Sequence, residues 1–164
     1  MVKIRRLRKK EVQKFLHEIR MNDDLSIETD LEKITSVEVT KSSLGFTIYL
    51  VNGNASYVRK NNSLFPLLSN EKLVKLLNRI TVDMGAIPYI CNGADVMAPG
   101  VVKVSSDFDY GTLVAVVDET HGKVIAIGKA VLDSKDIRNA EKGKVVDVLH
   151  YVGDRVWDYV KELI

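Results

Sequence analysis

The sequence predicts an α+β protein made of two parts. Amphipathic helical patterns and strand patterns are mixed in its first half, while short β-rich segments punctuated by turns dominate the second half. A length of 164 residues is enough for two small domains. No Gly/Ser-rich linker separates the halves. We expect an N-terminal α+β domain over residues 1–81 and a β-rich domain with a C-terminal helix over residues 82–164.

The first half contains one well-marked hairpin. Residues 46–51 are aromatic and β-branched and predict a strand, Asn52-Gly53 is a turn signal, and residues 55–60 read as the returning strand. A second turn is expected at residues 61–63, and a β-prone stretch surrounds residues 34–39. The hairpin therefore predicts the centre of an antiparallel sheet.

Two helices and a short strand complete this half. Residues 2–7 predict the strand, and the apolar spacing of residues 9–19 predicts an amphipathic helix. Leucines spaced so that they lie on one helical face predict a second helix over residues 71–80, with Ser69 or Asn70 as its N-cap.

The second half reads as a small barrel or sandwich. A short helix over residues 134–140 is expected to start at an N-cap Ser134 and to end at Gly143, and a final helix carries Val156, Trp157 and Val160. The expected strands cover residues 86–91, 101–104, 113–117, 124–130 and 145–151.

Composition excludes several classes of protein. No apolar run approaches the roughly 20 residues that span a bilayer, and the basic N-terminus precedes no apolar segment of the kind found in signal peptides. The single cysteine, Cys91, rules out an internal disulfide and a multi-cysteine zinc site. We therefore expect a cytoplasmic protein with no membrane partner, no metal and no cofactor.

Charge is unevenly distributed along the chain. The formal net charge is +2, yet residues 1–20 hold eight basic and two acidic side chains, and residues 82–164 hold nine basic and thirteen acidic ones. The basic segment is either a footprint for phosphate or a solvated helix face. Its candidate RNA contacts are Arg5, Arg6, Arg8, Lys9 and Lys10.

No catalytic arrangement stands out. The three histidines follow no metal-binding spacing, and the Gly143-Lys144 dipeptide lacks the upstream glycine of a phosphate-binding P-loop. The carboxylate pairs Asp107/Asp109 and Asp118/Glu119 adjoin turn signals, where aspartate is favoured for local hydrogen bonding. Cys91 ends an apolar segment and fits a buried structural cysteine. We expect no catalytic residues.

A short glycine-flanked loop is the most informative stretch. Gly93 and Gly100 bracket it, and Pro99-Gly100 predicts a tight turn into a strand. Glycine permits close backbone approach and positive φ, so the loop is either a structural turn or a surface that offers backbone groups to RNA.

The same residues carry a family resemblance. Gly85-Ala86-Ile87 and the segment Gly93–Val101, followed by Gly128-Lys129-Ala130 and Leu149–Asp154, resemble the signature of the PUA domain over about residues 82–160. The N-terminal half, through Phe65-Pro66-Leu67-Leu68, resembles the two-domain archaeal PUA proteins and their eukaryotic relatives, the malignant T-cell amplified sequence proteins.

The resemblance implies a β-pseudobarrel that binds RNA near the glycine-flanked loop. It places the loop residues Gly93, Ala94, Asp95, Val96, Met97, Pro99 and Gly100 on that surface. The basic side chains Lys103, Lys129, Lys144 and Arg155 can add phosphate contacts if they share a face, and of these Lys103 and Arg155 are our candidates. The relatives imply the small ribosomal subunit and a translation-factor partner.

We interpret the chain as a non-catalytic RNA-binding protein that recognises structured RNA, either tRNA or ribosomal RNA, in translation. Two alternatives stay open. One is an accessory subunit of an RNA-modification enzyme, and the other is a protein-interaction adaptor whose basic segment holds an acidic partner.

Overall fold

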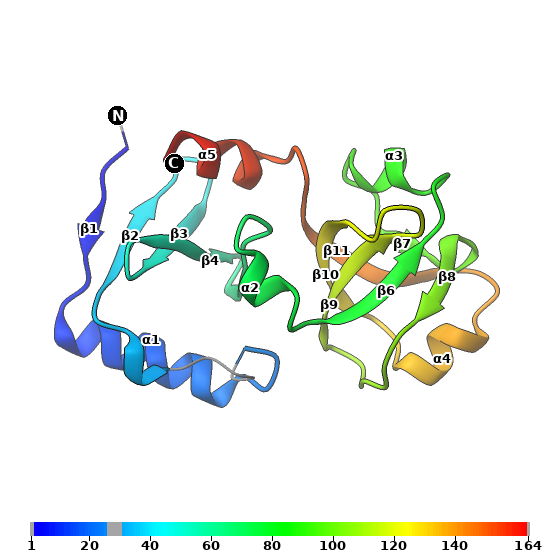
Figure 1. Cartoon of the computed structure of the whole chain (residues 1–164), viewed down its shortest axis with the longest axis horizontal. Coiled ribbons are helices and arrows are strands. Elements are labelled where there is room, and N and C mark those ends of the chain that lie inside the picture. The colour runs from blue at the N-terminus through cyan, green and yellow to red at the C-terminus, as the bar shows by residue number, and fades with distance from the viewer. Residues whose placement is uncertain (1, 26–30, 164) are drawn as a thin grey trace. The chain divides into compact units, whose positions relative to one another are not determined.

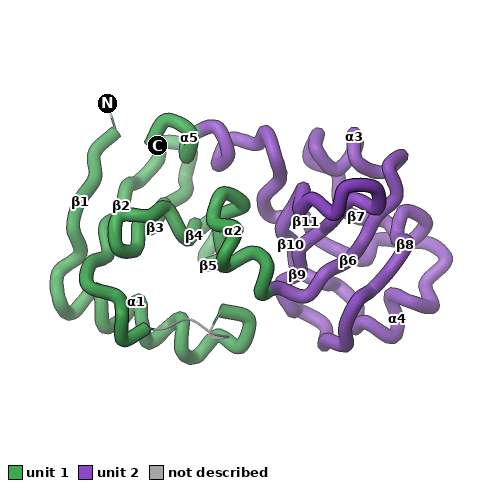
Figure 2. Tube along the Cα trace, in the orientation of Figure 1, with its two compact units in different colours: residues 1–76, 159–164 green, residues 77–158 purple. Residues whose placement is uncertain are grey.

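The protein folds into two compact units in a computed structural model that describes residues 2–25 and 31–163. The first unit comprises Met1–Leu76 and Tyr159–Ile164, and the second comprises Leu77–Asp158 (Figure 2). Each unit has its own sheet, so the α+β fold class is confirmed. The boundary expected at residues 81–82 falls at the end of a strand that belongs to the second unit.

A five-stranded antiparallel meander forms the first unit (Figure 1). Strand β3 has the predicted bounds, and the strand expected over residues 2–7 shortens to two residues at the sheet edge. In order across the sheet, the strands are β1 (Arg5–Arg6), β2 (Val37–Lys41), β3 (Phe46–Val51), β4 (Asn54–Lys60) and β5 (Ser63–Pro66).

Helix α1 (Lys9–Met21) packs on one face of this sheet. Phe15 is buried, and its ring stacks on Tyr49 at a centroid distance of 4.6 Å while meeting Tyr57 edge-on at 5.7 Å. The predicted one-face apolar pattern therefore formed as expected, and the aromatic contacts fix the helix on β3 and β4. A short 3-10 helix η1 (Leu31–Lys33) precedes β2.

The helix predicted over residues 71–80 is wrong in its second half. Helix α2 (Glu71–Val74) begins at the predicted N-cap Asn70, whose side chain accepts a hydrogen bond from the Leu73 N–H at 3.3 Å. Strand β6 (Asn78–Val82) follows almost at once. Ile80 and Val82 are fully buried and alternate with half-buried residues, so pairing within the second sheet overrides the helical spacing of the leucines.

The second unit contains a six-stranded, mostly antiparallel sheet. Strand β6 runs parallel to β9, and all other neighbours are antiparallel. In order across the sheet, the strands are β7 (Val96–Met97), β11 (Lys144–Tyr151), β10 (Val124–Ala130), β9 (Leu113–Asp118), β6 and β8 (Val101–Val104).

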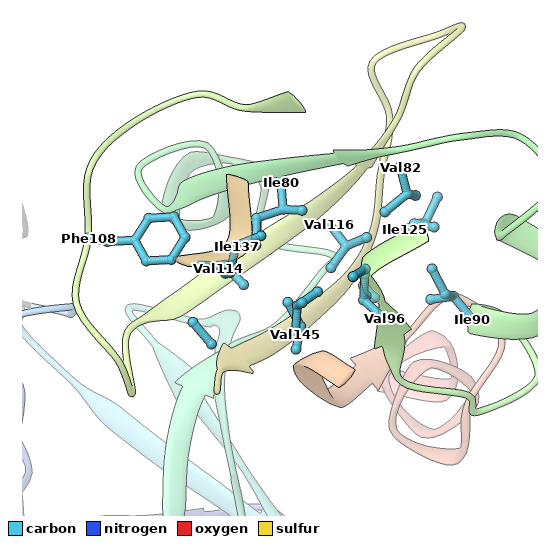
Figure 3. Packing of buried hydrophobic residues seen from close by; sticks show 14 residues of the cluster. Ile80, Val82, Ile90, Val96, Phe108, Val114, Val116, Ile125, Ile137 and Val145 are labelled. Atoms are coloured by element: carbon cyan, nitrogen blue, oxygen red, sulfur yellow. The ribbon is translucent and has the colours of Figure 1, made fainter. Parts of the chain in front are cut away.

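The core of the second unit lies between these strands and two short helices. Figure 3 shows Ile80, Val116 and Val145 from three strands converging with Ile90 of helix α3 (Ile87–Ile90) and Ile137 of helix α4 (Ser134–Asn139). All five side chains are at most 2% exposed. Burial of this apolar set supplies the main driving force for folding of the unit.

Two local predictions in this unit are corrected. The strand expected over residues 86–91 is instead helix α3, because Pro88 has no N–H to donate to a sheet but fits the first turn of a helix. Helix α4 is capped by Asp133, whose carboxylate accepts the Asp136 N–H at 2.8 Å. The hydroxyl of Ser134, the predicted cap, instead accepts the Phe108 N–H at 3.0 Å.

Helix α5 (Arg155–Leu163) ends the described chain. Its N-cap Asp154 is buried and accepts the Trp157 N–H at 2.7 Å. The hydroxyl of Tyr159, a residue of the first unit, lies 2.7 Å from the Thr40 hydroxyl, and the Tyr159 ring meets the Phe46 ring edge-on. Within the described ranges, no helix has the length and apolar character needed to cross a membrane.

Candidate nucleic-acid interface

The glycine-flanked loop runs from the end of α3 into β7 and the 3-10 helix η2 (Ala98–Gly100). Backbone hydrogen bonds fix its start, since the Ala94 N–H donates to the Tyr89 carbonyl at 2.9 Å. The Ala98 N–H donates to the Gly143 carbonyl at 2.8 Å and fixes its end. The loop is thus held at both ends by backbone hydrogen bonds, to α3 and to Gly143 just before β11.

The two glycines serve different purposes. Gly93 has a φ of +97°, a conformation that side chains rarely adopt, and a Cβ there would lie 3.3 Å from the Tyr151 hydroxyl. Gly100 has ordinary backbone torsions, but a Cβ there would lie 3.2 Å from the Cβ of Ala86. One glycine is needed for the turn and the other for close packing against the start of α3.

The Asp95 carboxylate is bonded to the neighbouring strand, although 37% of the side chain stays exposed. Its Oδ1 atom accepts the Val148 N–H of β11 at 2.8 Å. The ammonium of Lys144 lies 3.8 Å from its Oδ2 atom and 2.6 Å from the Asp147 carboxylate. The hydrogen bonds and charges of these two aspartates raise the pKa of Lys144. The one carboxylate of the loop is therefore neutralised at the edge of the sheet.

The loop residues divide into exposed and buried ones. Gly93, Ala94 and Pro99 are exposed, and Met97 keeps 49% of its surface accessible. Val96, which the resemblance places on the RNA surface, has its side chain in the core at 1% exposure. Its backbone pairs with Val146, so Val96 contributes to the shape of the loop and offers no side chain to a ligand.

Three exposed apolar side chains flank the loop in sequence, and the sequence analysis did not identify them as candidates. Tyr89 of α3 is 71% exposed, Met84 is 41% exposed and Val102 of β8 is 54% exposed. The Asp83 N–H donates to the Gly100 carbonyl at 2.9 Å, which brings the Met84 segment beside the loop. Reading Pro88 as a helix-start signal would have predicted a helix at this position in place of a strand.

The predicted basic residues are all exposed but differ in their partners. Lys103 lies on β8 and Arg155 begins α5, both in the second unit. In the first unit, the Arg5 guanidinium forms two hydrogen bonds with the Glu11 carboxylate at 3.0 and 3.1 Å. Arg6, Arg8, Lys9 and Lys10 are exposed at β1 and the start of α1.

Two of the carboxylates considered for catalysis have structural partners. Asp107 pairs with Arg138 at 2.7 Å, and Asp118 accepts the His121 and Lys123 N–H groups of the β9–β10 turn. The hydrogen bond from the His121 N–H is the main reason that the pKa of Asp118 is lowered. Partial burial raises the pKa of the Cys91 thiol. In the part of the chain that the structure describes, no His, Cys, Asp and Glu side chains gather as a metal site.

The fold and the glycine-flanked loop define the second unit as a PUA domain, the RNA-binding module whose family signature matches residues 78–152. A domain of unknown function, DUF1947, matches residues 6–70. The chain therefore belongs to the family of PUA proteins that carry this N-terminal domain, which confirms the resemblance in the sequence.

Relatives match along nearly the whole chain. An uncharacterised protein of Methanocaldococcus jannaschii is 36% identical over 156 residues, or 93% of this chain and 94% of its own. Translation machinery-associated protein 20 of Saccharomyces cerevisiae is 27% identical over 139 residues, covering 80% and 77% of the two chains. The crystal structure of an Aeropyrum pernix PUA domain in a tartrate complex aligns with a TM-score of 0.85 at 25% identity, covering 99% and 93%.

Proposed function

We propose that this protein is a non-catalytic RNA-binding protein of the translation machinery that recognises structured RNA, either tRNA or ribosomal RNA. The observation that carries the proposal is the composition of the exposed loop. Glycine, proline and Met97 face solvent, while the carboxylate of Asp95 is held by the Val148 N–H. Because Val148 and Lys144 engage the one carboxylate of the loop, the loop can approach a phosphate backbone closely and read its shape.

The surroundings of the loop suit contact with RNA. Tyr89 and Met84 offer exposed apolar and aromatic surface on which an unstacked base can pack. Lys103, exposed on β8, offers a positive charge for a phosphate. We include Arg155 of the second unit and the exposed N-terminal residues Arg6, Arg8, Lys9 and Lys10 as phosphate contacts that release counterions.

Kinship supports a role in translation. The yeast relative is named as translation machinery-associated, and that name motivates the small ribosomal subunit and a translation-factor partner as binding partners of this chain in the cytoplasm. We also propose that the protein is not an enzyme, because Asp107 is engaged in an ion pair with Arg138 and Asp118 in the hydrogen bonds of the β9–β10 turn.

The test is an RNA titration with matched variants of the second unit. Met97→Glu with Lys103→Glu alters the proposed surface, whereas Tyr110→Glu with Lys135→Glu makes the same charge change at exposed positions outside it. Fluorescence anisotropy with tRNA and with small-subunit rRNA fragments, at several salt concentrations, gives the dissociation constants. Glycine variants are avoided because Gly93 and Gly100 are needed for the fold of the loop.

We expect submicromolar binding by the wild type, a loss of at least about tenfold in the loop variant, and a much smaller loss in the control. Equal losses in both variants would show that RNA affinity depends on overall charge and not on the loop, and would contradict the proposed surface. Absence of RNA binding by the wild type would reject the function and favour the protein-interaction adaptor. Copurification with a modification enzyme would favour the accessory subunit.

A further inference from the structure

A charged pocket lies in the first unit, between helix α1 and the face of the sheet that the helix covers. It has a volume of about 480 Å³. Four basic and two acidic side chains line it, together with the uncharged residues Leu7, Phe15, Val39, Thr47 and Tyr49. The charged residues are Arg5, Lys14, Lys41, Arg59, Glu11 and Glu18.

Strand register builds one wall of the pocket. Lys41 of β2 lies opposite Thr47 of β3, and Thr47 lies opposite Arg59 of β4. Directly opposed residues in antiparallel strands point to the same face, so the three side chains form a row across the sheet. The neighbouring row contains Tyr49, on which Phe15 of α1 stacks, and this contact places the helix over the same face. Lys14, adjacent to Phe15, lines the pocket from the helix side.

Arginine neutralises both carboxylates of the pocket. Glu11 accepts two hydrogen bonds from Arg5, and these bonds lower its pKa to about 2. Glu18 accepts two hydrogen bonds from Nη2 of Arg59, while Nε of Arg59 donates to the Tyr49 hydroxyl at 3.0 Å. Among residues 2–25 and 31–163, Lys14 and Lys41 have no carboxylate within ion-pair distance. The pocket therefore keeps a surplus of two positive charges.

We propose that this pocket binds a phosphate group, with the ammonium groups of Lys14 and Lys41, the Thr47 hydroxyl and the Arg59 guanidinium as its donors. The donor set favours phosphate over a peptide carboxylate. A carboxylate is best held by two nitrogens of one arginine. Both Nη atoms of Arg5 are bonded to Glu11, while Nη2 and Nε of Arg59 are bonded to Glu18 and Tyr49. Arg59 therefore has only its Nη1 to offer, which can donate to one phosphate oxygen but cannot grip a carboxylate alone. Separate point charges and a hydroxyl suit the several oxygens of a phosphate.

Partial burial and prior hydrogen bonding hold Arg59 in position before a ligand arrives. Its side chain is 31% exposed and is bonded to both Glu18 and Tyr49. Little side-chain freedom is therefore lost when a phosphate binds beside it. On the function proposed above, on which this step rests, the phosphate is a backbone phosphodiester of the bound RNA. The first unit then holds RNA through a defined pocket in addition to its exposed basic segment.

The test compares two double variants with equal charge loss in the first unit. Lys14→Gln with Lys41→Gln removes the donors of the pocket, and Lys60→Gln with Lys75→Gln removes two exposed lysines that do not line it. Thr47→Val removes the hydroxyl without changing charge. Amide NMR spectra of each protein are recorded with inorganic phosphate, RNA binding is measured against salt concentration, and thermal unfolding verifies that each variant folds.

We expect phosphate to shift the amide signals of residues around Thr47 and to saturate. The Lys14/Lys41 variant should bind phosphate about tenfold more weakly, and its RNA salt slope should fall by roughly two. The Lys60/Lys75 variant should keep phosphate binding, and Thr47→Val should weaken it severalfold.

Each contrary result has its own meaning. Equal phosphate binding by both lysine variants overturns the pocket. Phosphate binding that depends on Lys14 and Lys41, with unchanged RNA binding, overturns the phosphodiester as the occupant in favour of a free phosphate. If RNA binding is lost in the Met97→Glu/Lys103→Glu variant and not in the pocket variant, the proposed function stands and this inference fails. If the wild type binds phosphate but no RNA, the proposed function fails and the phosphate site stands.

Discussion

The carboxylate of Asp95 accepts a hydrogen bond from the Val148 N–H at 2.8 Å and so joins two segments that lie 53 residues apart in the chain. This bond ties the glycine-flanked loop to strand β11. Lys144, which neighbours Asp95 across the sheet edge, balances its charge at 3.8 Å. Asp95 therefore fixes the shape of the loop, and its partly exposed side chain lies among the residues of the proposed RNA surface.

Replacing Asp95 should separate its structural role from any contact with RNA. Asp95→Ala leaves the Val148 N–H without its partner and should lower the free energy of unfolding by about 1–2 kcal/mol. Asp95→Asn keeps an acceptor oxygen and should cost less. Urea denaturation measures both effects. Because the loop keeps its shape in Asp95→Asn while losing a negative charge, RNA affinity should be unchanged or higher, and a large loss of affinity there would assign Asp95 a direct contact.

Gly128 in strand β10 should tolerate no side chain. A Cβ at this position would lie 2.4 Å from Cγ1 of Val146 and 2.6 Å from the Asp147 carbonyl oxygen, at the irregularity where β10 pairs with β11. Gly128→Ala must push the two strands apart and should cost about 2 kcal/mol or more in unfolding free energy.

The matched control for this substitution is Gly85→Ala. Its Cβ would meet only the Asp83 carboxylate at 3.4 Å, an ordinary contact, and the backbone of Gly85 is not in the left-handed region. We expect its unfolding free energy to change little, because alanine also reduces the freedom of the unfolded chain. A similar loss in both alanine variants, measured by thermal or urea unfolding, contradicts the steric argument at Gly128.

Strand predictions succeeded where the local pattern agreed with the tertiary environment. Residues 46–51, 101–104 and 124–130 form strands with the predicted bounds, because each segment is rich in residues that favour strands and pairs with a neighbouring strand of its sheet. The segment 71–80 failed because leucine spacing is compatible with a helix, whereas the parallel pairing of β6 with β9 is a long-range contact without a local signal.

The site could be predicted only in part. Glycine and proline spacing located the loop, since a positive φ at Gly93 and a close approach at Gly100 have local sequence signals. The hydrogen bond of Asp95 depends on Val148, which lies 53 residues away in the sequence. The row of Lys41, Thr47 and Arg59 likewise depends on the register of three strands. Turn lengths influence this register, but it cannot be predicted from the identity of single residues.

Asp154 should make stability depend on pH at the acidic end. Burial alone would raise its pKa, but the hydrogen bonds from His150, Trp157 and Tyr151 outweigh burial and lower the pKa below the usual value of about 3.9. A carboxyl group with a lowered pKa in the folded state contributes stability above its unfolded pKa. This contribution disappears as pH falls through the folded value.

Asp154→Asn keeps an oxygen that can cap α5 but removes the charge that faces buried His150. We expect a loss of about 1–3 kcal/mol near pH 7 that shrinks steadily below about pH 4. Asp158→Asn, at an exposed position of the same helix, is the control and should show little change. Urea unfolding midpoints from pH 2.5 to pH 7 provide the comparison, and a pH-independent loss in Asp154→Asn would assign the effect to packing.

Glu11 should titrate far below an ordinary glutamate, because its pKa is about 2. The hydrogen bonds from Arg5 are the main cause, and the Arg8 N–H, 2.7 Å from Oε2, adds a second donor at the start of α1. Arg5→Gln should therefore raise the pKa of Glu11 only part of the way toward the usual value of about 4.3, since the Arg8 N–H remains. Carbon-detected NMR titration of the side-chain carboxyl measures this shift, with Lys10→Gln as a charge-matched control. An ordinary pKa for Glu11 in the wild type would show that the Arg5–Glu11 pair does not persist in solution, and Arg5 would then be free to join Arg6 and Arg8 as a phosphate contact.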